Sequence, residues 1–221
     1  MSAPFEKTHF IWLTIALIAL LILGAISRSI PDNMTLHVLE FSTVGLLLLS
    51  LMSLNTERKL IKWFVLIIGL MLSTSVVQGY TETVYFEYTF LALLLIFMFL
   101  AAWLVGSQVL LTGSVDLNKI VGSVALYLII GLIFSIFYVI LLEFSPHALN
   151  GIESTNWYDN MPTTTYFSFV TLATLGYGEI HPATPVAEVI AILEAITGLF
   201  YMAVIVAGLI GAKLKLSLIH I

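Results

Sequence analysis

Five consecutive residues in the C-terminal half of the chain could hold an ion through their backbone. They are Thr174, Leu175, Gly176, Tyr177 and Gly178. Glycine reaches the left-handed region of backbone conformation without steric penalty, so the two glycines allow a backbone that ordinary residues would not hold. If successive residues alternate between right- and left-handed conformations, their carbonyl groups all point the same way. A column of such oxygens, with the threonine hydroxyl at its base, can replace the hydration shell of a dehydrated monovalent cation.

The composition places these five residues in an integral membrane protein. Of the 221 residues 60% are hydrophobic and 10% are charged, whereas a soluble domain is typically about 25% charged. The chain has no cysteine, which excludes disulfides and thiolate metal sites. Its basic residues form no patch beyond one short cluster, so we predict no nucleic-acid partner. It has no H-E-x-x-H motif and no polar trio that would place a nucleophile beside a base, so we predict neither an enzyme nor a cofactor.

Hydropathy predicts six membrane-crossing helices, because a span needs about 20 mostly apolar residues to cross about 30 Å of hydrocarbon. The predicted spans are His9–Ser27, Leu36–Leu54, Leu60–Gly79, Tyr88–Leu111, Ile120–Leu142 and Val186–Ala212. The first span could instead be a signal peptide, since Lys7 precedes it and Ala25-Ile26-Ser27 resembles a cleavage site. Its apolar run from Phe10 is longer than the usual signal-peptide core of about 7–15 residues, which favours a retained span.

The charges of the loops predict how the chain is oriented in the membrane. With a cytoplasmic N-terminus, every basic residue except Arg28 lies inside, as the positive-inside rule requires. The outer loops are acidic by contrast. We therefore expect a multi-pass protein of the plasma membrane or inner membrane, with both termini in the cytoplasm. Residues 174–178 then lie in the outer half of the bilayer.

Two polar residues in the second span, and the absence of basic residues from the fourth span, bear on function. His37 and Glu40 of the second span lie three residues apart, on one helical face. A metal or proton site there is one interpretation, and an interfacial position near the outer end of the span is the other. Voltage sensing needs several basic residues in one span, and the fourth span, Tyr88–Leu111, has none. We therefore predict that the N-terminal helices do not sense voltage.

The residues on either side of 174–178 extend this loop into a longer pattern. Before it, Pro162–Ala173 is a helical stretch too short to cross a bilayer, and Pro162 is typical of a first helical turn. After it comes Glu179-Ile180-His181-Pro182. Together the three segments resemble the pore helix, selectivity filter and outer mouth of potassium channels. The resemblance implies that Thr174, Leu175, Gly176 and Tyr177 bind K⁺, and that four chains form a homotetramer around one pore, because one filter cannot surround an ion.

The resemblance also implies roles for residues outside the filter. By this resemblance, the filter is supported by Tyr166, Glu179 and Glu143, the outer mouth is lined by His181, the inner helix hinges at Gly198, and the cavity is lined by Met202, Val206 and Ile210. Glu194 lies one turn above Gly198, at a membrane depth where a charge is expensive and typically functional, so we assign it a role in supporting the pore helix. Aspartate is usual in the family where Glu179 stands, so the hydrogen bond from Tyr166 is in question. The alternatives are a solvated Glu143, a His181 turned into the outer loop, and an inner-helix stripe that packs on the fifth span.

The sequence thus predicts an all-α integral membrane protein built from two domains. Residues 1–113 form a four-helix domain, and residues 114–221 form a potassium channel pore domain with outer helix, pore helix, filter and inner helix. We expect a subunit that conducts K⁺ passively and is not voltage-gated. The alternatives are a poorly selective monovalent cation channel and a subunit of a potassium-uptake transporter. The gating stimulus and any regulatory partner cannot be predicted.

Overall fold

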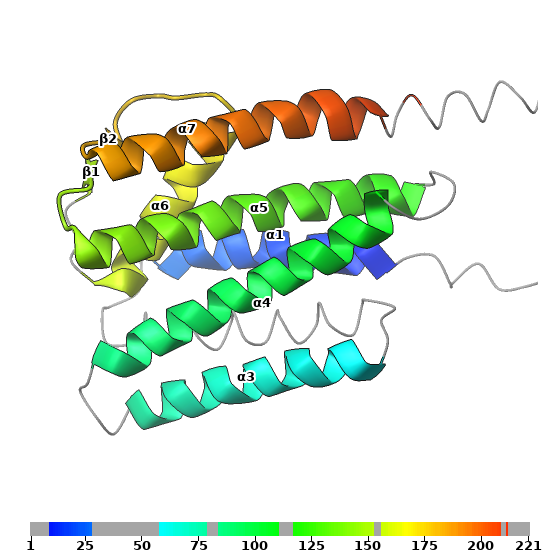
Figure 1. The fold of residues 1–221 in the computed structure, drawn as a ribbon, viewed down its shortest axis with the longest axis horizontal. Helices are drawn as coiled ribbons and strands as arrows, with labels where there is room; N and C mark the ends of the chain where they lie inside the picture. The colour runs from blue at the N-terminus through cyan, green and yellow to red at the C-terminus, as the bar shows by residue number, and fades with distance from the viewer. Residues whose placement is uncertain are drawn as a thin grey trace, which may run out of the picture.

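The computed structural model describes residues 9–27, 58–78, 84–110, 117–152, 156–208 and 211. Within these residues the fold is helical apart from two very short strands (Figure 1). The helices are α1 (His9–Ser27), α3 (Arg58–Gln78), α4 (Val84–Leu110), α5 (Leu117–Phe144), α6 (Trp157–Leu172) and α7 (Pro185–Phe200), which continues as the π-helical segment η2 (Tyr201–Val206). The strands β1 (Leu149–Asn150) and β2 (His181–Pro182) pair antiparallel. The predicted second span with His37 and Glu40, and the predicted domain boundary at residue 113, lie outside the described residues.

Four of the described helices are long and apolar enough to cross a membrane. The apolar segments are Leu60–Val77, Tyr85–Leu110, Leu117–Phe144 and Pro185–Ala203. They coincide with the predicted third, fourth, fifth and last spans, so in the described residues these four predicted spans form helices suited to a membrane. In α1 the apolar stretch Phe10–Ile26 is shorter. A full set of six spans therefore stays a prediction.

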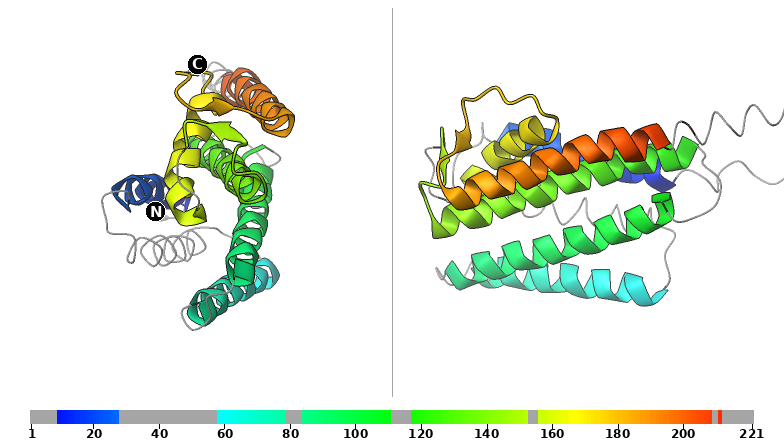
Figure 2. Two further views of the ribbon diagram at one scale, coloured as in Figure 1. Left: turned by 90° about the vertical axis from the view of Figure 1, so that its left-hand side faces the viewer. Right: turned by 45° about the horizontal axis from the view of Figure 1, so that its top comes forward.

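Helix α5 contacts most of the other described helices. It packs against α1, α4 and α6 (Figures 1 and 2), while α3 packs on α4. Two glycines allow close approach: a Cβ at Gly122 would lie 2.8 Å from Phe10 and from Val109, and one at Gly131 would lie 2.7 Å from the ring of Phe169. Small residues of α5 thus serve close helix packing. Through these contacts α1 and α4 share one apolar core with α5.

The pore helix, α6, begins earlier than predicted. Its first residue is Trp157, so the prediction that the helix begins at Pro162 is wrong. Proline suits a first helical turn because the N–H groups there have no helical acceptor, but Pro162 lies inside the helix. The turn before it is held by Trp157, which is buried and whose ring centroid lies 5.6 Å from that of Phe90 in α4. Burial of this tryptophan adds a turn that the proline signal alone does not predict.

Two neighbouring residues determine where helix α7 begins. Thr184 is its N-cap, and the threonine hydroxyl accepts a hydrogen bond from the Ala187 amide at 3.4 Å. Pro185 follows in the first helical position, where its missing N–H costs nothing. The start of the last helix is therefore determined locally, a few residues beyond the loop that contains the candidate site.

Candidate ion-binding site

The backbone of residues 174–178 alternates in handedness. Thr174, Gly176 and Gly178 have φ values of 57°, 56° and 94°, and no other residue of this loop has a positive φ. A Cβ built at either glycine would meet nothing within 4 Å, so conformation rather than space requires glycine there. Thr174 is β-branched, and a positive φ is a strained conformation for it. The loop therefore adopts the alternation that its two glycines permit, and the alternation includes one residue that is not glycine.

Hydrogen bonds from the loop to the end of α6 orient its carbonyl groups. The Leu175 amide donates to the Val170 carbonyl at 2.9 Å, the Gly176 amide donates to the same oxygen at 3.4 Å, and the Thr174 amide donates to Thr171 at 2.9 Å. In a trans peptide the C=O points away from the N–H of the next residue. The carbonyls of Ala173, Thr174 and Leu175 therefore all point away from the pore helix. A cation bound beside the loop would meet a row of carbonyl oxygens of this kind.

A side-chain bond holds the other end of the loop. The Tyr166 hydroxyl of α6 donates to Oε1 of Glu179, the residue after Gly178. This bond lowers the pKa of the Glu179 carboxyl below its ordinary 4.5 and raises the pKa of Tyr166 above 10.0. Glu179, although one methylene longer than the aspartate that is usual in the family, therefore does accept the hydrogen bond from Tyr166. The loop is tied to α6 at its base by Val170 and at its top by Tyr166.

The outer mouth is connected to β1 through His181. Its Nε2 lies 3.1 Å from the Asn150 side-chain amide, and its Nδ1 lies 3.3 Å from the Gly178 carbonyl. One neutral tautomer satisfies both contacts: Nδ1–H donates to Gly178, and Nε2 accepts from Asn150. Next to Asn150, Gly151 has a φ of 85°, and a Cβ there would lie 2.1 Å from the Glu179 carbonyl. Sequence reasoning missed the roles of Asn150 and Gly151, for which the only signal was a glycine in the outer loop.

The two remaining carboxyl groups that we predicted to support the filter lie in different surroundings. Glu143, at the end of α5, shares a hydrogen bond with Tyr88 of α4, and its Oε1 is buried without a partner. Among the described residues no hydrogen bond joins it to the backbone of the outer mouth. Glu194 of α7 is fully buried and contacts Ser168 of the pore helix at 2.5 Å. Glu194 thus lies against the pore helix and Glu143 against α4.

The predicted hinge glycine fills a tight contact. A Cβ at Gly198 of α7 would lie 1.9 Å from the carbonyl oxygen of Leu172, the last residue of the pore helix. Close approach of the two backbones therefore requires glycine, whether or not the helix bends there. Of the predicted cavity-lining residues, Met202 is exposed in the single chain. The Val206 side chain and Ile210 lie outside the described residues.

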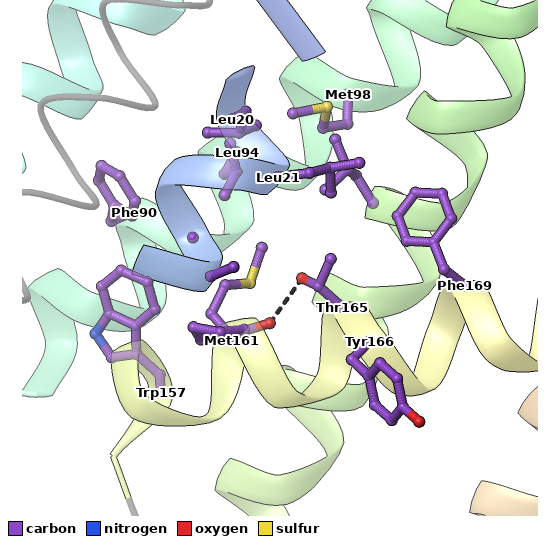
Figure 3. A pocket seen from close by; sticks show the side chains of 14 residues that line it. Leu20, Leu21, Phe90, Leu94, Met98, Trp157, Met161, Thr165, Tyr166 and Phe169 are labelled. Carbon is purple, nitrogen blue, oxygen red and sulfur yellow. Dashed lines mark hydrogen bonds between the residues drawn. The ribbon is translucent and has the colours of Figure 1, made fainter. Parts of the chain in front are cut away.

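An apolar cavity of about 440 Å³ lies between the pore helix α6 and helices α1 and α4 (Figure 3). Helices α1, α4, α5 and α6 all contribute to its wall, which includes Leu20, Leu21, Phe90, Leu94, Met98 and Phe169. Tyr166 is one of the residues around the cavity, but its ring points away from Leu20 and Leu21 (Figure 3), toward the side of α6 where its hydroxyl binds Glu179. Sequence reasoning did not predict this cavity, because it depends on how α1 packs against α6.

Among the described residues no group of three His, Asp or Glu side chains could hold a metal ion. The cation ligands that the site offers are therefore the carbonyl oxygens of the loop and the Thr174 hydroxyl. Such neutral oxygens suit a weakly held monovalent ion that must enter and leave quickly.

Comparisons with known proteins point to the same segment. Residues 123–212 match a protein-family model described as "Ion channel". A rice protein (Oryza sativa subsp. japonica) named "Two pore potassium channel c" is 39% identical over 52 residues, which cover 24% of this chain and 11% of that protein. The chain thus spans a small part of the length of this curated relative, and no solved structure matches it. Residues 123–212 are thus similar to an ion channel family, and part of the chain is similar to a potassium channel.

Proposed function

We propose that this chain is a subunit of a channel that lets K⁺ cross the membrane passively and excludes Na⁺. The observation that carries the proposal is the alternating backbone of residues 174–178, with its amides bonded to α6 and its carbonyls directed away from it. Rings of such carbonyls replace the hydration shell of K⁺. The match to a potassium channel over 52 residues supports the same ion.

We propose further that four chains assemble around the filter. A single copy offers oxygens on only one side of an ion, so a closed ring requires several copies. In one chain the filter side chains Leu175 and Tyr177 are 59% and 68% exposed. Helix α7 also exposes a series of large apolar side chains, which include Val189, Ile192, Leu193, Ile196, Leu199 and Phe200. Burial of the filter and of part of this face between neighbouring chains is what a fourfold channel provides.

The proposed topology has six spans per subunit and both termini in the cytoplasm of a plasma or inner membrane. It rests on the loop charges and on the apolar segment at residues 36–54. Helix α4 contains no lysine or arginine, which supports a channel that membrane voltage does not gate. A transporter subunit with four fused pore repeats fits less well, because the chain carries one filter sequence.

Purified protein in liposomes tests this function. We expect K⁺ to leave loaded vesicles through the protein down its gradient, and Na⁺ to be retained in matched vesicles. Equal fluxes of both ions would favour the poorly selective cation channel. The mass of the detergent-solubilised protein tests the assembly separately, and a mass other than that of four chains would contradict the tetramer.

A further inference from the structure

Glu194 is a carboxyl group buried among hydroxyls inside the protein. It has no exposed surface, and it lies on α7 between α5 and α6. Its Oε2 lies 2.7 Å from the Tyr138 hydroxyl of α5, and its Oε1 lies 2.5 Å from Oγ of Ser168 in the pore helix. Ser168 is itself fully buried, and its Oγ lies 2.7 Å from the Gly131 carbonyl of α5. The four groups form one continuous chain of contacts across three helices.

The number of protons available determines the charge of this chain. A serine hydroxyl has one proton to donate. An ionised Glu194 and the Gly131 carbonyl could both only accept, so one of the two short contacts of Ser168 would join two lone pairs. A buried contact of that kind is costly, because neither oxygen can turn to water.

A neutral Glu194 satisfies every contact. The carboxylic acid donates from Oε1 to Ser168, Ser168 donates to the Gly131 carbonyl, and Tyr138 donates to Oε2. Three protons then make three hydrogen bonds, and no buried group lacks a partner.

The electrostatic surroundings of Glu194 favour the same state. The titratable groups near it are Tyr138 and Tyr127 of α5, and α6 contributes the uncharged Ser168. Among the described residues Glu194 has no lysine, arginine or histidine partner. An ionised carboxylate without a countercharge is expensive at membrane depth, whereas the neutral acid is not.

We propose that Glu194 is held as an uncharged carboxylic acid, and that its proton completes a hydrogen-bond chain that positions the pore helix between α5 and α7. Ser168 lies two residues before Val170, whose carbonyl accepts the Leu175 and Gly176 amides. The acid is therefore a positioning residue for the base of the filter. Its effect on conduction rests on the proposed function, whereas its protonation state does not.

Infrared spectroscopy of the membrane-reconstituted protein at neutral pH tests the charge directly. The difference spectrum of wild type minus Glu194→Gln should contain the carbonyl band of a protonated carboxylic acid. Tyr138→Phe removes a donor to that carbonyl and should shift the band, so this variant tests the assignment even if Glu194→Gln does not fold. Carboxylate bands in place of the acid band, or an acid band that Tyr138→Phe leaves unmoved, would overturn the proposal whether or not the protein selects K⁺.

The positioning role has its own test. Glutamine can donate from its amide to Ser168 and accept from Tyr138, whereas alanine can do neither. We expect Glu194→Ala to lower the thermal stability of the assembled protein, and Glu194→Gln to recover most of that loss. An equal loss in both variants would contradict the neutral hydrogen-bond chain.

Discussion

A methyl group at Gly198 tests the contact between the inner helix and the end of the pore helix. In Gly198→Ala the new Cβ would lie 1.9 Å from the Leu172 carbonyl oxygen, where ordinary contacts begin at 3.4 Å. The two helices must therefore separate by about 1.5 Å at this point. Overpacking costs about 1–3 kcal/mol, and the upper end applies here because the neighbour is backbone and cannot change rotamer. Alanine returns about 1 kcal/mol of helix propensity, so we expect a net loss of about 2 kcal/mol.

Thermal unfolding of the reconstituted protein, read together with its K⁺ flux, measures this effect. Leu172 lies two residues before Thr174, so the displacement should also reduce K⁺ flux. Gly69→Ala is the matched control, because it also replaces a helical glycine and its Cβ would meet nothing within 4 Å. We expect this control to be as stable as wild type or slightly more stable. If Gly198→Ala is stabilised as Gly69→Ala is, the close contact does not exist in the assembled protein.

Three further perturbations test other parts of the account. Tyr166→Phe removes the bond that lowers the pKa of Glu179; that bond stabilises the folded filter above the ordinary carboxyl pKa of 4.5 and is lost as pH falls through the lowered value. The variant lacks this bond at every pH, so its K⁺ current at neutral pH should be smaller than that of wild type, and the difference should shrink as outside pH falls through the lowered pKa of Glu179. A difference that stays constant with pH, or no difference at neutral pH, would refute this. Because α4 has no basic residue, open probability should change little with voltage, whereas a sensor gains about 2.3 kcal/mol per charge per 100 mV. A steep voltage dependence that persists when permeant ions are exchanged would contradict that prediction. His181→Tyr should strengthen block by external tetraethylammonium, by about 0.5–1 kcal/mol for each ring that contacts the blocker; an unchanged block would show that residue 181 faces away from the pore axis.

The conformation of the filter could be predicted from sequence because it depends on residue type. Glycine at every second position permits left-handed backbone, and Gly176 and Gly178 both adopt it. Thr174 could not be predicted in the same way, since threonine normally avoids a φ of 57°. Its conformation is imposed by the hydrogen bonds between the loop and the end of α6. Local sequence therefore accounts for two of the three left-handed residues.

The contacts that support the site depend on packing and were harder to predict. Burial depth indicated that Glu194 has a function, but its partners Tyr138 and Ser168 lie 56 and 26 residues away in the chain. The helix-start signal of Pro162 was misleading, because the burial of Trp157 outweighed it. Long-range packing of helices determines both features, and no local pattern encodes it.

The claim on which the account depends is that left-handed backbone at residues 174–178 makes the pore selective for K⁺. The most direct measurement is the reversal potential of wild type and Gly178→Ser in planar bilayers, with K⁺ on one side and Na⁺ on the other. Serine strains a backbone with a φ of 94°, although its Cβ would meet nothing within 4 Å. For wild type we predict a large reversal potential, of the sign that opposes K⁺ flow from the K⁺ side. For Gly178→Ser we predict either a reversal potential near zero or no current. A wild-type reversal near zero, or a Gly178→Ser channel with wild-type selectivity and conductance, would contradict the account.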